Sequence, residues 1–308
     1  MRALVVGSSS YVAGGLINEL LKTGVDVTLS NRSHPLVEGV DRPNRFIPVD
    51  FFDVSSFSEA IEGQDVIYYC AGLDRKTSSA APDLAEYISA EVPGKIAELA
   101  DASGANRFIY LSTTHVYGLS IEGESDENSP TDPVDAYAHS RVSGEKRLLE
   151  SGYNQIQVSV ARLGNVFGWS TNMSTSTMSL VGNDLCIQAA KTGDVIIRAN
   201  PNISRNFIPL SQAARDLSRL GLSTTPNDYV YNLVWPKSLT LSEFGTRVRL
   251  QCLQTLHLDI NLNFAKPAEY APQMNYADTR IRKISSLDAE SFDAEIRKLL
   301  IKYSELSE

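Results

Sequence analysis

The chain has 308 residues, 43% of them hydrophobic, and a net charge of −9, so it can bury a core but lacks the basic surface that nucleic acids need. Three widely spaced cysteines and four histidines without metal-ligand spacing predict neither disulfides nor a metal site. The first apolar run is too short for a signal peptide, and no apolar stretch is long enough to cross a bilayer. We therefore expect a cytoplasmic protein that binds no membrane.

Short apolar runs alternate with helix-like stretches through the first half of the chain. Residues 3–6 are purely apolar, which is typical of a strand buried on both faces of a parallel sheet. A Gly/Ser turn, an amphipathic stretch over 12–21 and a helix-ending Gly24 follow. The later predicted strands are 25–29, 46–49, 66–70, 108–111 and 158–161, and the later predicted helices are 56–61, 85–102 and 136–150. This alternation predicts an α/β fold with a doubly wound parallel sheet.

The alternation stops after residue 162. Residues 168–182 are rich in Ser, Thr and Asn, which indicates a loop over a site. From about residue 231 short strands and helices mix, which predicts a smaller C-terminal substrate-binding domain. We assign residues 1–165 and about 205–230 to a dinucleotide-binding Rossmann domain, and residues 166–204 and 231–308 to the substrate-binding region.

The turn after the first predicted strand has the spacing of a GxxGxxG motif. It reads Gly7-Ser8-Ser9-Ser10-Tyr11-Val12-Ala13. In such turns the backbone N–H groups reach a pyrophosphate at a helix N-terminus. Ala13 satisfies the need for close packing of the helix on the strand, whereas Ser10 is a departure from glycine. Any tight turn could carry this pattern, but its place after the first strand favours a dinucleotide.

The end of the second predicted strand bears on the choice of cofactor. It reads Ser30-Asn31-Arg32 and contains no acid. NAD-binding proteins place an Asp or Glu there for the ribose 2′-hydroxyl, and a guanidinium suits a 2′-phosphate. The sequence therefore favours NADP, with NAD as the alternative. An ordinary exposed loop arginine would also account for Arg32.

Three further segments together carry a family resemblance. They are Thr113-Thr114-His115-Val116-Tyr117-Gly118 after a strand, Ala136-Tyr137-Ala138-His139-Ser140-Arg141 at the start of a helix, and Arg162-Leu163-Gly164-Asn165-Val166-Phe167-Gly168. With them the chain resembles the extended short-chain dehydrogenase/reductase family, the nucleotide-sugar epimerases, dehydratases and reductases, up to about residue 235. The resemblance implies a nucleotide-sugar substrate and a homodimer formed through helices such as 85–102 and 136–150.

The resemblance also implies catalytic roles. Thr113 corresponds to the residue that hydrogen-bonds the reacting substrate oxygen, and Tyr137 to the general acid/base of the YxxxK motif. The family lysine holds the nicotinamide ribose and lowers the pKa of the tyrosine; here Arg141 occupies its position. Arginine keeps the positive charge but has a different donor geometry. Alternatively, Tyr137 and Arg141 are an ordinary pair on a helix surface.

His115 lies two positions before the tyrosine of the VYG motif. Family members that remove a proton from a sugar carbon often have an additional acid/base residue there, and histidine titrates in a suitable range. A histidine at a strand end without a chemical role is the alternative. The Asp-Glu pair of dehydratases is replaced by Thr114-His115, which argues against 4,6-dehydration.

Further residues correspond to family positions that contact ligands. Asn165 and Arg205 correspond to residues near the substrate diphosphate, although Pro209 and Gln212 replace a histidine and an aspartate of the Arg205 segment. Asp50 corresponds to an acid that contacts adenine, or else caps a helix beginning near Ser55. We assign to the cofactor Gly7, Ser9, Ser10, Tyr11, Val12, Asn31, Arg32, Asp50, Phe51, Cys70, Ala71, Gly72, Tyr137 and Arg141.

The resemblance as a whole predicts an NADP-dependent oxidoreductase or epimerase acting on a hydroxyl or keto group of a nucleotide-activated sugar. One alternative is a reductase of a non-nucleotide carbonyl compound, which the altered Arg205 segment favours. The other is an NADP-binding regulator without turnover, which Ser10, Arg141 and Pro209 favour.

Overall fold

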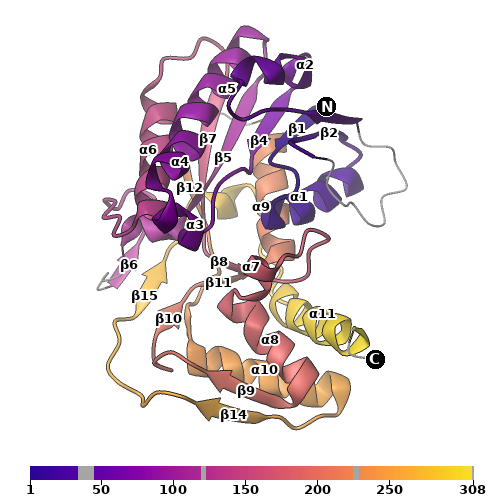
Figure 1. Ribbon diagram of the computed structural model, residues 1–308, viewed down its shortest axis with the longest axis vertical. Helices are drawn as coiled ribbons and strands as arrows, with labels where there is room; N and C mark the ends of the chain where they lie inside the picture. Colours follow the sequence, from indigo (N-terminus) through magenta and orange to yellow (C-terminus); the bar gives the residue numbers. More distant parts are fainter. Residues whose placement is uncertain (34–44, 119–122, 225–228, 307–308) are drawn as a thin grey trace.

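A seven-stranded parallel sheet forms the centre of the N-terminal part (Figure 1). The computed structural model describes residues 1–33, 45–118, 123–224 and 229–306. The strand order is β3-β2-β1-β4-β5-β7-β12. The strands are β1 (Arg2–Val6), β2 (Asp26–Asn31), β3 (Arg45–Pro48), β4 (Val66–Tyr69), β5 (Arg107–Thr113), β7 (Gln157–Leu163) and β12 (Val230–Leu233). The predicted doubly wound α/β sheet is confirmed.

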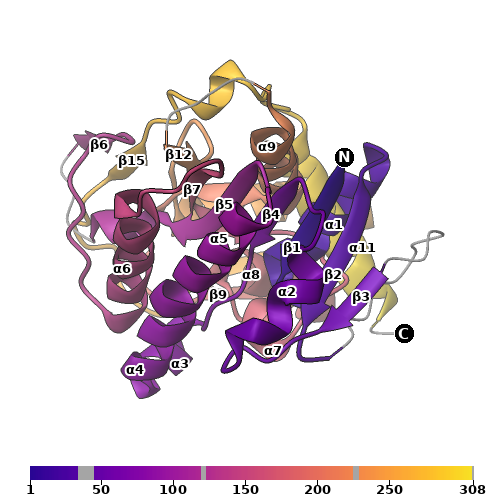
Figure 2. The same cartoon turned by 90° about the horizontal axis from the view of Figure 1, so that it is seen from above.

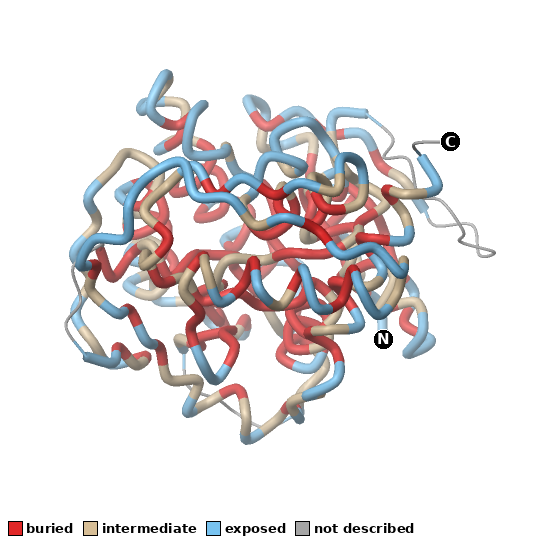
Figure 3. Tube along the Cα trace, turned by 90° about the horizontal axis from the view of Figure 1, so that it is seen from below, coloured by how far each residue is buried: buried red, intermediate tan, exposed pale blue. Residues whose placement is uncertain are grey.

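Helices cover both faces of this sheet (Figure 2). Helices α1 (Tyr11–Lys22) and α9 (Leu210–Leu222) pack on one face, and α2 (Ser58–Ile61), α5 (Val92–Ala102) and α6 (Ala136–Glu150) on the other. The buried residues concentrate between these layers (Figure 3). Helix α6 has the predicted bounds because the Asp135 carboxylate accepts a hydrogen bond from the Ala138 backbone N–H at 2.8 Å and caps its first turn.

The predicted helix over 85–102 has a more complex course. It consists of α4 (Pro82–Glu86), a π-helical turn η2 (Tyr87–Glu91) and α5. Two further short elements follow the central strands: α3 (Arg75–Ala80) after β4, and the 3₁₀ turn η3 (Thr114–Tyr117) after β5. No helix in the described part of the chain combines the length and the apolar composition that a membrane span requires.

The remaining elements gather below the sheet around a second apolar cluster (Figure 1). Phe207 and Phe244 stack there with ring centroids 4.1 Å apart. The elements are α7 (Thr175–Met178), α8 (Val181–Thr192), α10 (Leu241–Leu256), α11 (Ser291–Glu305), and the strand pairs β8 (Asn165–Phe167) with β11 (Phe207–Pro209), β9 (Asp194–Ile197) with β14 (Asn261–Phe264) and β10 (Ser204–Arg205) with β13 (Leu239–Thr240). Apart from this cluster, η4 (Ile281–Lys283) packs on the sheet face that α1 and α9 cover, and β6 (Gly123–Ser125) pairs with β15 (Met274–Tyr276), which packs against η3.

The segment 168–182, expected as a loop, is partly helical. It contains α7 and the first residues of α8. The short helix forms because Ser174 and Thr177 make a capping box. The division of the chain into a dinucleotide-binding domain and a substrate-binding region stays a prediction.

Candidate cofactor pocket and active site

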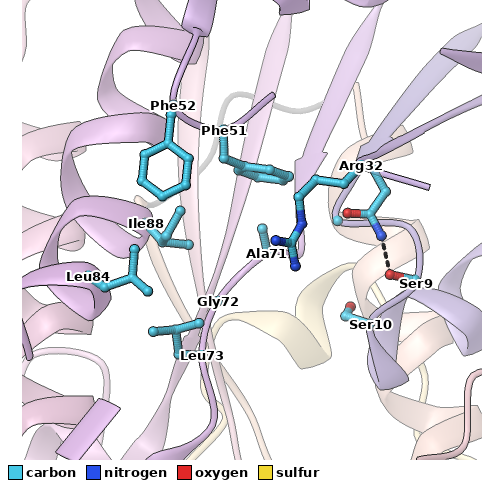
Figure 4. A pocket seen from close by; sticks show the side chains of 12 residues that line it. Ser9, Ser10, Arg32, Phe51, Phe52, Ala71, Gly72, Leu73, Leu84 and Ile88 are labelled. Atoms are coloured by element: carbon cyan, nitrogen blue, oxygen red, sulfur yellow. Dashed lines mark hydrogen bonds between the residues drawn. The ribbon is translucent and has the colours of Figure 1, made fainter. Parts of the chain in front are cut away.

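The carboxyl ends of β1, β2 and β4 border a pocket of about 310 Å³ (Figure 4). Strand β1 pairs with β2 on one side and β4 on the other, so the pocket lies where the strand order reverses, the usual ligand position in such sheets. Its lining residues are Gly7, Ser9, Ser10, Asn31, Arg32, Phe51, Phe52, Ala71, Gly72, Leu73, Leu84 and Ile88.

The glycine turn brings the backbone at Gly7 close to the chain that follows β4. Gly7 has φ +75°, and a Cβ there would lie 2.6 Å from the Ala71 backbone nitrogen, so the position excludes other residues. Ser10 has an ordinary φ of −71°, and its hydroxyl accepts from the Ala13 N–H at 3.4 Å as the N-cap of α1. The departure from glycine at Ser10 is therefore a helix cap.

The pocket has a polar and an apolar half (Figure 4). The exposed Arg32 side chain lies in the polar half, where the Asn31 amide also donates to the Ser9 hydroxyl. Phe51, Phe52 and the aliphatic side chains of Leu73, Leu84 and Ile88 form the apolar half. Sequence reasoning missed Phe52, Leu73, Leu84 and Ile88, because apolar residues in a pocket wall carry no motif.

Several residues assigned to the cofactor from sequence lie outside the pocket wall. They are Tyr11, Val12, Asp50, Cys70, Tyr137 and Arg141. The Asp50 carboxylate accepts from the Phe52 N–H at 2.9 Å, and Asp53 caps the following turn, so the alternative role of Asp50 as that helix cap is wrong. Burial raises the pKa of the Cys70 thiol to about 12, so this thiol stays protonated. The contribution of these six residues to cofactor binding stays a prediction.

The segment after β8 packs against the glycine turn. The Asn172 amide donates to the Ser8 carbonyl at 2.9 Å and the Ser10 carbonyl at 3.1 Å. The Ser170 hydroxyl donates to the Tyr11 carbonyl at 2.9 Å, and the Tyr11 hydroxyl donates to the Gly168 carbonyl at 2.6 Å. Residues 168–172 therefore hold the turn from outside the sheet.

At the end of β5, His115 lies next to both Thr113, the last residue of the strand, and Tyr137. The capped first turn of α6 presents Tyr137, whose ring lies 6.1 Å from that of His115 at an interplanar angle of 80°. The Thr113 hydroxyl oxygen accepts from the His115 backbone N–H at 3.3 Å. Its own proton is therefore available to a ligand oxygen.

Arg141 is buried next to this group, at the carboxyl ends of the central strands β4 and β5. Its Nη1 donates to the carbonyls of Ala71 at 3.3 Å and Leu111 at 2.9 Å. Its Cζ lies 5.5 Å from the ring centroid of Tyr137 and 5.8 Å from that of Tyr110. The alternative of a surface helix pair is wrong, because Arg141 is only 7% exposed. Burial lowers the pKa of Arg141, but interactions with Tyr110, Tyr137 and Tyr69 raise it by more, so the pKa is raised overall.

His115 is uncharged at neutral pH. Burial lowers its pKa to about 4, and the cations Arg75 and Arg205 contribute to this lowering while Asp135 opposes it. Arg75, from α3, also forms an ion pair with Asp135, with 2.6 Å between Nε and Oδ2. Sequence reasoning missed Arg75, since its partner lies on a distant part of the chain. A neutral imidazole can accept a proton.

The two predicted substrate residues are half-buried on the short strands below the sheet. The Asn165 backbone N–H donates to the Asn206 carbonyl at 2.7 Å. Arg205 Nη1 donates to the Ser204 carbonyl at 2.8 Å, and burial lowers its pKa. The charge of Arg205 acts on His115, so it lies on the same side of the site. Substrate contact by both residues stays a prediction.

A buried ion pair fixes α6 against the strands. Glu145 accepts from Arg162 Nη2 at 2.6 Å and from its Nε at 3.1 Å, and also from the Ser112 hydroxyl. The Arg162 guanidinium lies 4.8 Å from the centroid of the Tyr117 ring. Sequence reasoning missed this pair, although Glu145 follows Arg141 by one helical turn. Among the described residues, no group of His, Cys, Asp and Glu could hold a metal ion.

A parallel sheet with a glycine turn at its switch point defines a Rossmann-type nucleotide-binding fold. The sequence model of the NAD dependent epimerase/dehydratase family matches residues 3–215. The chain belongs to this family, and the predicted resemblance to the extended short-chain dehydrogenases is confirmed.

Curated relatives include a dTDP-glucose 4,6-dehydratase of Streptomyces niveus, 28% identical over 189 residues that cover 54% of each chain. A UDP-glucose 4-epimerase of Lactobacillus helveticus is 24% identical over 180 residues, 56% of this chain and 54% of the relative. The match thus spans about half the length of these relatives.

Solved structures share the fold along the whole chain. The Thermotoga maritima UDP-glucose 4-epimerase with UDP-glucose has a TM-score of 0.82 at 15% identity, covering 100% of both chains. MoeE5 in complex with UDP-glucose and NAD has a TM-score of 0.80 at 16% identity, covering 100% of this chain and 99% of that one.

Proposed function

We propose that this protein is an NADP-dependent oxidoreductase or epimerase that acts on a hydroxyl or keto group of a nucleotide-activated sugar. The observation that carries the proposal is the position of His115 next to both Thr113 and Tyr137 at the end of β5, with the Arg141 cation close to Tyr137. The names of the relatives, which act on or bind UDP- and dTDP-sugars, support the substrate class.

The pocket residues suit the phosphate-bearing, adenosine end of a dinucleotide. The backbone at Gly7, Ser9 and Ser10 would hold the pyrophosphate, and Arg32 would pair with a ribose 2′-phosphate. MoeE5 was solved with NAD, which remains the alternative cofactor, but this chain places a cation and no acid at the end of β2. A bound nicotinamide supplies or accepts the hydride at the carbon that bears the reacting oxygen.

The side chains at the end of β5 handle the protons. The Thr113 hydroxyl donates a hydrogen bond to the reacting oxygen and orients it. Tyr137 gives a proton to that oxygen or takes one from it, and the positively charged Arg141 guanidinium lies 5.5 Å from the centroid of its ring. Neutral His115 can take a proton from a neighbouring carbon, as epimerisation next to a keto group requires, and its lowered pKa makes it a weak base for this step.

Arg205 and Asn165 would bind the nucleotide diphosphate, because a guanidinium matches phosphate oxygens. We also propose a homodimer. The helices implied for its interface, α4 to α5 and α6, run side by side on one face of the sheet (Figure 1). Sedimentation of the purified protein tests this part.

Cofactor and substrate are tested in two stages. Calorimetric titration with NADPH and NADH comes first, with NADPH expected to bind more tightly. The protein is then incubated with UDP-glucose or dTDP-glucose in ²H₂O, and proton NMR follows sugar epimers, keto sugars and exchanged carbon-bound protons. The proposal is contradicted if the protein binds neither NADPH nor NADH.

One observation favours a second candidate, an NADP-binding regulator. The buried Arg141 guanidinium is fixed through Nη1 to two main-chain carbonyls, which is a structural role that requires no turnover. This candidate predicts tight NADPH binding, no conversion or exchange of either sugar, and no reduction of a panel of simple ketones and aldehydes. Reduction of such carbonyl compounds alone indicates the non-nucleotide reductase.

A further inference from the structure

The apolar half of the pocket rests on the π-helical turn η2. Ile88, in this turn, lines the pocket, and Leu84 lines it one turn earlier. The Tyr87 ring stacks on Phe52 with centroids 5.6 Å apart and an interplanar angle of 9°. Phe52 also lines the pocket, although it is 66% exposed. Figure 4 shows Phe52, Ile88 and Leu84 together on one side, opposite Arg32.

The helix in this region lacks a backbone donor at a critical position. Val92 N–H bonds to the Tyr87 carbonyl, five residues back, which is π spacing. Pro93 follows and has no N–H. With π spacing its missing donor belongs to the Ile88 carbonyl, and with α spacing to the Ser89 carbonyl.

Two buried tyrosine hydroxyls supply donors to these two carbonyls. Tyr69, at the end of β4, donates to the Ile88 carbonyl at 2.5 Å. Tyr110, on the neighbouring β5, donates to the Ser89 carbonyl at 2.7 Å. Burial raises the pKa of Tyr69 well above its usual value and that of Tyr110 to about 12, so both remain donors at neutral pH.

The same turn also contacts the catalytic helix. A Cβ on Gly144 of α6 would overlap the Ser89 carbonyl oxygen, so the two backbones touch. The Ser140 hydroxyl donates to that of Ser89 at 3.4 Å. A shift of η2 would therefore disturb both the pocket wall and the helix that carries Tyr137.

We propose that Tyr69 and Tyr110 are positioning residues for dinucleotide binding. Their hydroxyls hold the π-turn in its observed register. In this register Ile88 faces the planar base of the nucleotide, and Tyr87 supports the ring of Phe52 against the same base. This rests on the proposed cofactor site and adds two residues far below its surface. A purine fits between such apolar walls, with its ribose phosphate directed to Arg32.

The test measures dissociation constants for NADPH and for 2′-phospho-ADP-ribose, which lacks the nicotinamide. Tyr69→Phe and Tyr110→Phe each remove only a hydroxyl. We expect both ligands to bind about threefold to tenfold more weakly, the range for loss of one buried hydrogen bond. Tyr68→Phe is the matched control: it is also buried in β4 but points to the other face, where its hydroxyl donates to the Ser218 carbonyl at 3.4 Å.

The control should lower the melting temperature while changing neither dissociation constant by more than about twofold. A second experiment restores the missing donor with Pro93→Ala. In that background at least one of Tyr69→Phe and Tyr110→Phe should weaken binding less than it does alone. The introduced backbone N–H can bond to the Ile88 carbonyl with π spacing, where it replaces the Tyr69 donor, or to the Ser89 carbonyl with α spacing, where it replaces the Tyr110 donor.

Three results would overturn the inference. They are unchanged affinity in Tyr69→Phe and Tyr110→Phe, equal losses in those variants and in Tyr68→Phe, and undiminished effects of both Tyr69→Phe and Tyr110→Phe in the Pro93→Ala background. Failure of the wild type to bind NADPH, NADH or the fragment would instead remove the proposed cofactor site itself, and this inference with it.

Discussion

The guanidinium of Arg141 lies directly against Gly72: a Cβ built on Gly72 would overlap Arg141 Nη2. Gly72 is exposed in the pocket wall, while Arg141 is buried behind it. The absent side chain at residue 72 therefore makes room for the arginine side chain at residue 141. The two residues form a unit that connects the candidate cofactor pocket to the candidate catalytic helix.

Gly72→Ala should displace the Arg141 guanidinium from the Ala71 carbonyl. We expect a loss of about 1–3 kcal/mol in the free energy of unfolding, as for other overpacked sites, together with reduced turnover. Urea denaturation and initial rates measure these effects. In an Arg141→Lys background the narrower lysine side chain should leave room for the added methyl group, so Gly72→Ala should cost less free energy of unfolding there. Equal losses in both backgrounds would contradict this packing relationship.

Arg141→Lys should retain activity, because the charge near Tyr137 remains. Arg141→Met should be slower by about tenfold or more, since a desolvated cation–π contact contributes about 2 kcal/mol. kcat and the cofactor Kd are compared for the three proteins. Equal kcat for wild type and Arg141→Met would show that this cation does not assist Tyr137.

Tyr137→Phe keeps the ring and removes the exchangeable proton. Turnover should fall by about 10²–10⁴-fold, the usual effect of losing a general acid/base. The Kd for NADPH should change little, because Tyr137 lies outside the pocket wall. Wild-type rates on a verified substrate would exclude Tyr137 from the proton transfer.

Arg32→Ala should weaken NADPH binding by roughly tenfold and leave NADH binding nearly unchanged. The physical reason is the loss of a charge-assisted bond to the 2′-phosphate, which contributes about 1.5–3 kcal/mol. Calorimetry with both cofactors checks this. Tighter binding of NADH than NADPH by the wild type would show that NAD is the cofactor.

The lowered pKa of His115 gives a pH dependence with a definite sign. The pKa is about 4 in the folded protein and about 6.5 in an unfolded chain. Between these values the unfolded chain binds more protons, so the free energy of unfolding falls as the pH drops from about 6.5 to about 4. His115→Gln should flatten this part of the curve, measured by urea denaturation at several pH values. An unchanged slope of the free energy of unfolding against pH would show that His115 does not cause this pH dependence.

Local signals explain why the sheet and α6 could be predicted. The central strands are short apolar runs, and α6 has Asp135 directly before it as a cap. The short strands below the sheet could not be predicted, because they exist only through pairing with distant segments, as Asn165 pairs with Phe207. The π-turn escapes prediction for the same reason: Pro93 is visible in the sequence, but the tyrosine hydroxyls that compensate for it come from two other strands.

The candidate site divides in the same way. Gly7, Arg32, Thr113 and Tyr137 lie within motifs, so their neighbourhood could be inferred from order along the chain. Arg75 could not, since its ion pair with Asp135 depends on how α3 and α6 pack. The apolar wall of the pocket could not either, because nothing distinguishes Ile88 from other buried residues of its helix.

Asn172 donates to the carbonyls of Ser8 and Ser10, so the segment that follows β8 also supports the glycine turn from outside the sheet. A ligand that reorders residues 168–172 changes the affinity of that turn for its own ligand, and thermodynamic reciprocity requires an equal effect in the opposite direction. Hydrogen bonds on the outside of the sheet, remote from any bond that is made or broken, then couple the two binding equilibria.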